Sequence, residues 1–457
     1  MASKISPTIF REYDIRGLVD RDLTEEAVEA IGKGLGTRVR RAGGKRVVVG
    51  RDCRLSGERF LRRMLAGLGA TGVDVVDLGV VPTPLTYFAA NTLPVDGLCM
   101  ITGSHNPAEY NGLKVGLGKT TLHGEEVQEL RRLVEAGRFA TGRGSVEQHD
   151  IVTPYRDHVR QNLQLGPRKL KVVLDGGNGT GGVVAVPLFE SLGIEVVPLF
   201  VEMDGRFPNH HPDPTVERNL EPLKRKVLEV KADVGIAYDG DADRVGAVDE
   251  QGQVLWGDQL MILFSRALLE ENPGAAIVGE VKCSMNLYDD IARKGGRPIM
   301  WKAGHSLIKA KMKEEGALLA GEMSGHIFFA NRWFGFDDGI YSSGRLLELL
   351  SRTDAPLSSL LADVPRTFAS PEVRVDCPEE KKFDVVRRAQ AFFSSRYETV
   401  TVDGVRITFP DGWGLVRASN TQPLLVLRFE ATSERRLKEI EALVTGEVER
   451  LKREVGA

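Results

Sequence analysis

The chain has 457 residues, enough for roughly three or four domains of ordinary size, and 42% of its residues are apolar. A net charge of −3 gives no basic excess, so we expect neither a nucleic acid nor a membrane surface as a partner. The first residues lack the apolar core of a signal peptide, no apolar run is long enough to span a bilayer, and the four scattered cysteines form no CxxC pair. We therefore expect a soluble cytoplasmic protein with reduced thiols.

A strand–helix–strand pattern recurs three times over most of the chain. The opening strands are expected at residues 46–52, 171–177 and 276–281, the helices at 57–70, 181–192 and 284–294, and the second strands at 73–76, 194–197 and 298–301. A later strand in each block, at 97–101, 234–238 and 317–320, leads directly into a polar motif. This alternation predicts mainly parallel sheets covered by helices on both faces, with functional groups beyond the carboxyl ends of the strands.

The first polar motif, residues 102–107, places a serine between a glycine and a histidine. Gly103 permits a tight loop, and the hydroxyl of Ser104 is a candidate nucleophile that His105 or Lys114 can deprotonate or assist. A plain polar loop is the alternative, because Ser-His pairs are common. The absence of a G-x-S-x-G elbow argues against a serine esterase.

Two further segments of the second block are weak candidates for ligand binding. The glycine-rich residues 176–182 match neither a Walker loop nor GxGxxG, so we do not expect nucleotide binding. His210 and His211 are adjacent, and neighbouring side chains point apart in an extended chain. A structural loop is therefore favoured there over a metal site.

The second polar motif has carboxylates at alternate positions, at Asp239, Asp241 and Asp243. Three carboxylates this close repel one another, and an all-oxygen ligand set favours Mg²⁺ as the compensating cation. An EF-hand is excluded because Arg244 occupies the sixth loop position, where a glycine is needed. A solvated acidic turn is the alternative, but the strand before the motif and the arginine after it favour a metal site beside a phosphate.

Two later loops carry groups suited to a sugar phosphate. In the first, Glu322, Ser324 and His326 lie close together, and a carboxylate can accept hydrogen bonds from neighbouring sugar hydroxyls. The second combines a guanidinium with small polar side chains, which suits a phosphate: Arg417, Ser419, Asn420 and Thr421. For each loop, a simple turn is the alternative interpretation.

The last part of the chain follows another pattern. Strands are expected at 373–375, 400–402, 405–409, 414–418 and 424–430, and helices at 379–394 and 434–454. The apolar positions of the final helix favour packing on a small sheet over a coiled coil; they are Leu437, Ile440, Leu443 and Val444.

In this order, the motifs resemble those of the α-D-phosphohexomutase superfamily, most closely its bifunctional phosphomannomutase/phosphoglucomutases. The resemblance runs from residues 10–17 to the loop at 417–421. It implies an α/β fold of three similar α/β/α domains with mixed, mainly parallel sheets, plus a smaller C-terminal α+β domain, around one central cleft. The expected domains are 1–150 with the nucleophile loop, 151–253 with the metal loop, 254–366 with the sugar loop, and 367–457 with the phosphate loop.

The resemblance also implies a role for each matching residue. Ser104 would cycle through phosphoserine, and an oxygen of its phosphate would share Mg²⁺ with Asp239, Asp241 and Asp243. The other catalytic candidates are His105, Lys114, Arg16, Arg244 and His305, of which Lys114, Arg16 and His305 are possible general bases. The substrate-binding candidates are Tyr13, Lys282, Glu322, Ser324, His326, Arg417, Ser419, Asn420 and Thr421.

The implied reaction is reversible phosphoryl transfer between C1 and C6 of mannose and glucose phosphates, with glucose 1,6-bisphosphate as intermediate and activator. The only implied partners are small hexose phosphates, and the protein would be a monomer or weak dimer. Phosphoglucosamine mutase is the nearest alternative, disfavoured by Gly103 and Met323. A Mg²⁺-dependent sugar phosphatase or a non-catalytic sugar-phosphate-binding protein would use only part of the motif set.

Overall fold

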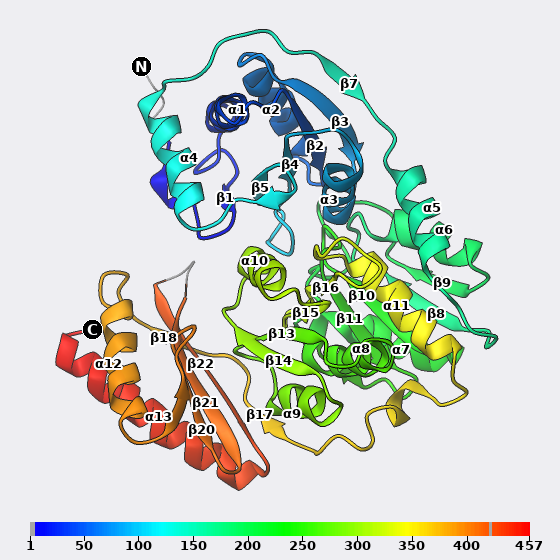
Figure 1. Cartoon of the computed structure of the whole chain (residues 1–457), viewed down its shortest axis with the longest axis vertical. Helices are drawn as coiled ribbons and strands as arrows, with labels where there is room; N and C mark the ends of the chain where they lie inside the picture. Colours follow the sequence, from blue (N-terminus) through cyan, green and yellow to red (C-terminus); the bar gives the residue numbers. More distant parts are fainter. Residues whose placement is uncertain (1–4, 420–422) are drawn as a thin grey trace. The chain divides into compact units, whose positions relative to one another are not determined.

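The structure, a computed structural model, describes residues 5–419 and 423–457 (Figure 1). The described residues divide into two compact units. Unit 1 runs to Leu260 and includes Ser324–Leu360, while unit 2 comprises Met261–Met323 and the described part of Leu361–Ala457. The boundaries of the four domains expected from the sequence remain a prediction.

Unit 1 begins with a seven-stranded mixed sheet in the order β1-β5-β4-β2-β3-β7, with β6 paired to β5. Its strands are β1 Ile15–Leu18, β2 Arg46–Arg51, β3 Asp74–Val80, β4 Gly97–Ile101, β5 Tyr110–Leu117, β6 Thr120–Thr121 and β7 Val146–Gln148. The accompanying helices are η1 Pro7–Ile9, α1 Glu25–Arg41, α2 Gly57–Gly69, α3 Thr83–Thr92 and α4 Glu125–Ala136. One apolar core joins this sheet to α1, α2 and α4, and α1 and α2 lie side by side in Figure 1.

The second sheet of unit 1 has the order β12-β11-β10-β8-β9. Its strands are β8 Lys171–Asp175, β9 Glu195–Leu199, β10 Val234–Tyr238, β11 Val245–Asp249 and β12 Val254–Leu255. The other elements of unit 1 are α5 Val152–Asn162, α6 Gly182–Ser191, η2 Glu217–Leu220, α7 Glu221–Val230, β16 Ile327–Phe329, α11 Gly339–Ser351 and η3 Leu357–Ser359. Leu223 and Val227 of α7 pack on Val173 and Val248, and full burial of each such side chain contributes about 1.5–3 kcal/mol.

Unit 2 contains a parallel arrangement of three strands and a separate antiparallel sheet. The first part consists of α8 Gly257–Glu271 (most of which belongs to this unit), β13 Ala276–Glu280, α9 Met285–Arg293, β14 Arg297–Trp301, α10 His305–Glu315 and β15 Leu319–Gly321. The second part consists of β17 Phe368–Ala369, β18 Val373–Asp376, α12 Lys382–Ser394, β19 Glu398–Val400, β20 Val405–Phe409, β21 Gly412–Ala418, β22 Leu424–Ala431 and α13 Glu434–Val455.

The C-terminal helix α13 packs on this antiparallel sheet, as the sequence predicts. Ile440 and Val444 belong to the same core as the sheet and α12, joined by Val448 and Leu451. Leu443 was expected on that face, but its side chain is 45% exposed, so this assignment was wrong. Among the described residues, no helix combines the length and apolar character needed to cross a membrane.

The three predicted blocks share one strand order, which confirms the expected fold class. In each block the opening strand lies between the second strand and the later strand and pairs in parallel with both. Thus β2 pairs with β3 and β4, β8 with β9 and β10, and β13 with β14 and β15. The polar motifs follow β4, β10 and β15. Each motif therefore leaves its sheet at the corresponding strand, at the carboxyl end where the chemistry was expected.

The loop before η2 contains a paired histidine. His210 Nε2 lies 3.0 Å from Asp175 Oδ2 at the end of β8, and its Nδ1 lies 2.9 Å from the carbonyl oxygen of His211. Because both ring nitrogens face acceptors, the charged imidazolium fits this site best. Burial lowers the pKa of His210, but the hydrogen bond and charge of Asp175 outweigh it, so the pKa is raised overall.

This pair predicts a pH-dependent contribution to stability. Because the pKa of His210 is higher in the folded state, its protonated ring stabilises the fold at pH values below the unfolded-state pKa. This stabilisation is lost as the pH rises through the folded-state pKa. We expect His210→Asn to lower the free energy of unfolding by about 1–2 kcal/mol at pH 5.5 and by less at pH 8.5. Urea unfolding at both pH values measures this, with His149→Asn as the control. An equal loss at both pH values would contradict the assignment.

Candidate functional site

Ser104 lies immediately beyond β4 in an unusual backbone conformation. Its φ is 49°, in the left-handed region that residues other than glycine rarely adopt. Its Oγ donates a hydrogen bond to Asp239 Oδ2 at 2.8 Å and lies 3.3 Å from His105 Nδ1. A Cβ atom at Gly240 would lie only 2.6 Å from the carbonyl oxygen of Ser104, so glycine permits this close approach. The first and second sequence motifs therefore meet within unit 1.

The three aspartates of the second motif form a buried cluster. The side chains of Asp239, Asp241 and Asp243 are fully buried, and each offers an oxygen within 4.8 Å of the others. Within the described part of the chain, Oδ1 of Asp241 and Oδ1 of Asp243 have no hydrogen-bond partner. Burial and the two neighbouring carboxylates raise the pKa of Asp239 well above its usual value. Unbonded buried carboxylate oxygens of this kind fit a divalent cation such as Mg²⁺.

A buried ammonium group lies among these carboxylates. Lys114 on β5 donates to Asp241 Oδ2 at 2.9 Å and to Asp243 Oδ2. Burial alone would lower the pKa of Lys114, but these two carboxylates outweigh it and raise the pKa well above the usual value. Burial likewise acts to raise the pKa of Asp241, yet Lys114 and the hydroxyl of Thr83, 2.5 Å away, lower it overall. One lysine thus offsets part of the charge of three aspartates.

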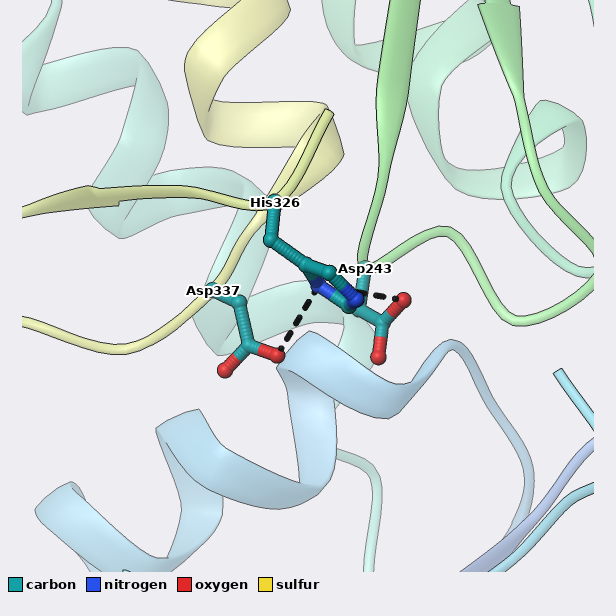
Figure 2. A group of neighbouring side chains, drawn as sticks. All are labelled: Asp243, His326 and Asp337. Carbon is teal, nitrogen blue, oxygen red and sulfur yellow. Dashed lines mark ion pairs between the residues drawn. The ribbon is translucent and has the colours of Figure 1, made fainter. Parts of the chain in front are cut away.

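His326 links this cluster to Arg244. Figure 2 shows the imidazole between Asp243 and Asp337, with Nδ1 3.7 Å from Asp243 Oδ1 and 3.3 Å from Asp337 Oδ2. On the other side of the ring, Arg244 Nε–H donates to Nε2 at 3.0 Å. Because Nε2 accepts, the ring proton belongs on Nδ1, facing the two carboxylates. The sequence grouped His326 with Glu322 and Ser324, whereas the structure places it beside Arg244.

Two further candidates of unit 1, Arg16 and His105, contact or belong to the nucleophile loop. Arg16 on β1 donates to Asn106 Oδ1 at 2.5 Å and pairs with Asp14 at 2.6 Å. Burial lowers the pKa of His105 well below its usual value, and the charges of Arg244 and Arg16 lower it further. Its imidazole is therefore neutral at pH 7. Tyr13, before β1, and Ser324 are half-buried.

In unit 2, Glu322 lies directly beyond β15 and is 5% exposed. Its Oε1 accepts a hydrogen bond from the backbone N–H of Gly304 at 2.6 Å, next to the buried His305 at the start of α10. Lys282 Nζ lies 3.3 Å from Glu372 and 3.8 Å from Glu280. The backbone N–H of Gly304 therefore fixes the carboxylate of Glu322, the group predicted to bind sugar.

The predicted phosphate loop is described only in part. Arg417 on β21 donates from Nε to Asp403 Oδ2 at 3.0 Å, which orients its guanidinium. The carbonyl oxygen of Ser419 accepts a hydrogen bond from Lys382 at 2.7 Å. Asn420 and Thr421 lie outside the described residues.

Four family models match the chain in order. Those for the phosphoglucomutase/phosphomannomutase α/β/α domains I, II and III match residues 7–141, 153–252 and 256–368, and that for the C-terminal domain matches 372–446. A phosphomannomutase/phosphoglucomutase of Pseudomonas aeruginosa is 48% identical over 97% of this chain and 96% of its own length. The chain belongs to the phosphoglucomutase/phosphomannomutase family.

Two further relatives support membership of this family. A phosphoglucomutase of Neisseria gonorrhoeae is 46% identical over 96% of this chain and 96% of its own length. A crystal structure of a phosphoglucomutase/phosphomannomutase family protein from Burkholderia thailandensis superposes with a TM-score of 0.93 at 45% identity and covers 98% of both chains. The predicted superfamily and isomerase class are confirmed.

Sequence reasoning missed several residues that contact the predicted site, including three beside the first two motifs and His326. Arg54 contacts the Ser104 loop, Thr83 contacts Asp241, and Asp337 contacts His326. Only Arg54 gave a usable signal, since it follows the first strand of its block at the edge where the family site was expected. Thr83, at the start of α3, lies far along the chain from Asp241. Asp337 is closer to His326 in sequence, but its neighbours suggest only a loop.

Proposed function

We propose that the chain is a phosphomannomutase/phosphoglucomutase. It would move a phosphoryl group between C1 and C6 of mannose and glucose phosphates through phosphorylated Ser104 and a 1,6-bisphosphate. The observation that carries this proposal is the hydrogen bond of 2.8 Å from Ser104 Oγ to Asp239, beside carboxylate oxygens that lack hydrogen-bond partners in the described chain. A hydroxyl nucleophile in contact with a cation site is the arrangement that phosphoryl transfer needs.

Asp239, Asp241 and Asp243 would hold Mg²⁺ together with an oxygen of phosphorylated Ser104. The bound cation would disperse negative charge on the phosphoryl group during transfer. Lys114 and Arg244 provide further positive charge beside the aspartates. Arg16 orients Asn106 of the same loop. The general base would be one of three candidates: Lys114, Arg16 and His305.

Several further residues would recognise the substrate. Glu322, with Ser324 and His326, would contact sugar hydroxyls, because its carboxylate is fixed by a backbone N–H. The phosphate that does not react would be bound by Arg417, Ser419, Asn420 and Thr421, with Lys282 and Tyr13 as further contacts. Glucose 1,6-bisphosphate would act as the activator that phosphorylates Ser104. A central cleft, a cytoplasmic location and a monomeric or weakly dimeric state remain predictions.

The proposal can be tested by ³¹P NMR. Purified protein is incubated with Mg²⁺, a trace of glucose 1,6-bisphosphate, and mannose, glucose or glucosamine 1-phosphate in parallel. We expect 6-phosphate signals from mannose and glucose, and no conversion when EDTA removes the cation. Conversion of glucosamine 1-phosphate alone would indicate a phosphoglucosamine mutase. Release of inorganic phosphate would indicate a phosphatase, and either result would reject the proposal.

A further inference from the structure

A buried arginine binds the backbone of the nucleophile loop. Arg54 follows β2, is 1% exposed, and directs its guanidinium into the loop after β4. Its Nη1 donates to the carbonyl oxygens of Pro107 at 2.6 Å and Tyr110 at 2.9 Å. Its Nη2 donates to those of Ser104 at 2.7 Å and Asn106 at 2.5 Å. One side chain therefore binds four carbonyl groups within residues 104–110.

Asp52 connects this guanidinium to the strand end that carries the nucleophile. Its Oδ2 accepts hydrogen bonds from Arg54 Nε at 3.2 Å, from the Thr102 hydroxyl at 2.8 Å and from the Gly103 N–H at 3.2 Å. The Thr102 oxygen in turn accepts a hydrogen bond from the Ser104 N–H at 2.8 Å. The backbone of Ser104 is thus held from its carbonyl side by Arg54 and from its amide side by Thr102 and Asp52.

These contacts act on a conformation that is costly by itself. A non-glycine residue in the left-handed region costs about 1–3 kcal/mol and persists only when its surroundings fix it. Four carbonyl dipoles that converge on one point also repel one another unless a cation lies between them. The fit is tight, since a Cβ atom at Gly103 would lie 2.5 Å from Arg54 Nε.

We propose that Arg54, oriented by Asp52, is the positioning residue that holds Ser104 in the conformation in which its hydroxyl contacts Asp239. The inference rests on the proposed function of Ser104 as the nucleophile. Arginine suits the task because its planar guanidinium offers five donors in fixed directions, whereas lysine offers one compact ammonium group. Arg54 acts on the loop backbone, so its effect should appear in the rate of transfer.

Arg168 provides a matched control within unit 1. Its guanidinium also binds one carboxylate and backbone carbonyls, donating to Asp233 at 2.5 Å, Thr353 at 3.0 Å and Ala355 at 2.9 Å. None of these partners belongs to the nucleophile loop. Arg168→Lys therefore removes hydrogen bonds of the same kind outside the nucleophile loop. It shows how far kcat falls when only such structural bonds are lost.

The test compares Arg54→Lys with Arg168→Lys in the full-length protein, well below both melting temperatures. For Arg54→Lys we expect kcat to fall on the order of 100-fold with little change in KM, because displacing a reacting group by about 1 Å has effects of this size. Amide hydrogen exchange of residues 103–110 should become faster than in the wild type. Arg168→Lys should change neither kcat nor exchange in that loop.

Wild-type kcat with unchanged exchange in Arg54→Lys would overturn the proposal, and so would equal losses of kcat in both variants. If Arg54→Lys does not fold, Thr102→Val replaces it, because it removes the hydroxyl between Asp52 and the Ser104 amide. We then expect kcat to fall about tenfold or more, and an unchanged kcat would overturn the proposal. If the wild type shows no mutase turnover, the proposed function fails, while the exchange measurement still tests the positioning by Arg54.

Discussion

Replacing Ser104 by alanine should lower kcat for the interconversion of hexose phosphates by on the order of 10⁴-fold or more, because the covalent route is lost with its nucleophile. The substitution removes one hydroxyl and its hydrogen bond to Asp239, so the fold should be retained. Incubation with glucose 1,6-bisphosphate should add one phosphoryl group to the wild type and none to the variant. Intact-protein mass spectrometry and the ³¹P NMR assay measure the two effects.

Ser343→Ala is a suitable control for this experiment. Ser343 on α11 is also fully buried, and its hydroxyl donates to the carbonyl oxygen of Gly339 at 2.7 Å. The control should keep both turnover and phosphorylation. A Ser104→Ala variant that still accepts a phosphoryl group would show that another residue is the nucleophile.

Replacing Lys114 by methionine should have the second largest effect, and it should act on both stability and turnover. The substitution removes the ammonium group that pairs with Asp241 and Asp243. Breaking a buried ion pair in this way costs about 3–5 kcal/mol. Bound Mg²⁺ would replace part of this charge. We therefore expect a large loss of stability in EDTA, a smaller loss with Mg²⁺, and a kcat lowered by about 100-fold or more.

Urea unfolding in EDTA and in Mg²⁺ tests this prediction, with the exposed Lys119→Met as the control. Mg²⁺ should raise the free energy of unfolding more in Lys114→Met than in the wild type. A variant as stable as the wild type in EDTA, or one that gains no more from Mg²⁺, would contradict the role of Lys114 as a substitute for the metal charge.

Much of the fold could be predicted because it depends on local patterns. Apolar runs with turn residues between them marked β2, β4, β10 and β13 to within a residue or so. The carboxyl-end rule then placed Ser104 and the aspartates each at the functional edge of its own sheet. Their meeting across more than a hundred residues was implied only by the family resemblance. These predictions need only the periodicity of each segment and the general behaviour of parallel sheets.

The rest depends on partners that lie far apart in the sequence. Arg54 follows β2 at the expected edge of its sheet, but only the folded chain shows that its guanidinium contacts the carbonyl of Ser104. His326 is near Glu322 in sequence, and that spacing gave no sign that its ring also contacts Arg244 and Asp337. Leu443 fitted the apolar repeat of its helix, but it lies about 100° around the helix from the buried Val444 and is exposed.

Because the ammonium of Lys114 pairs with Asp241 and Asp243, we expect the aspartate cluster to stay folded without a divalent ion. A cell short of magnesium would then lose turnover of this enzyme without losing the protein, because a chain that stays folded is not exposed to proteases. Activity should return when the cation returns, with no new synthesis. Full recovery of turnover after EDTA treatment and addition of Mg²⁺, with no refolding step, would show that the metal-free protein stays folded and can be reactivated.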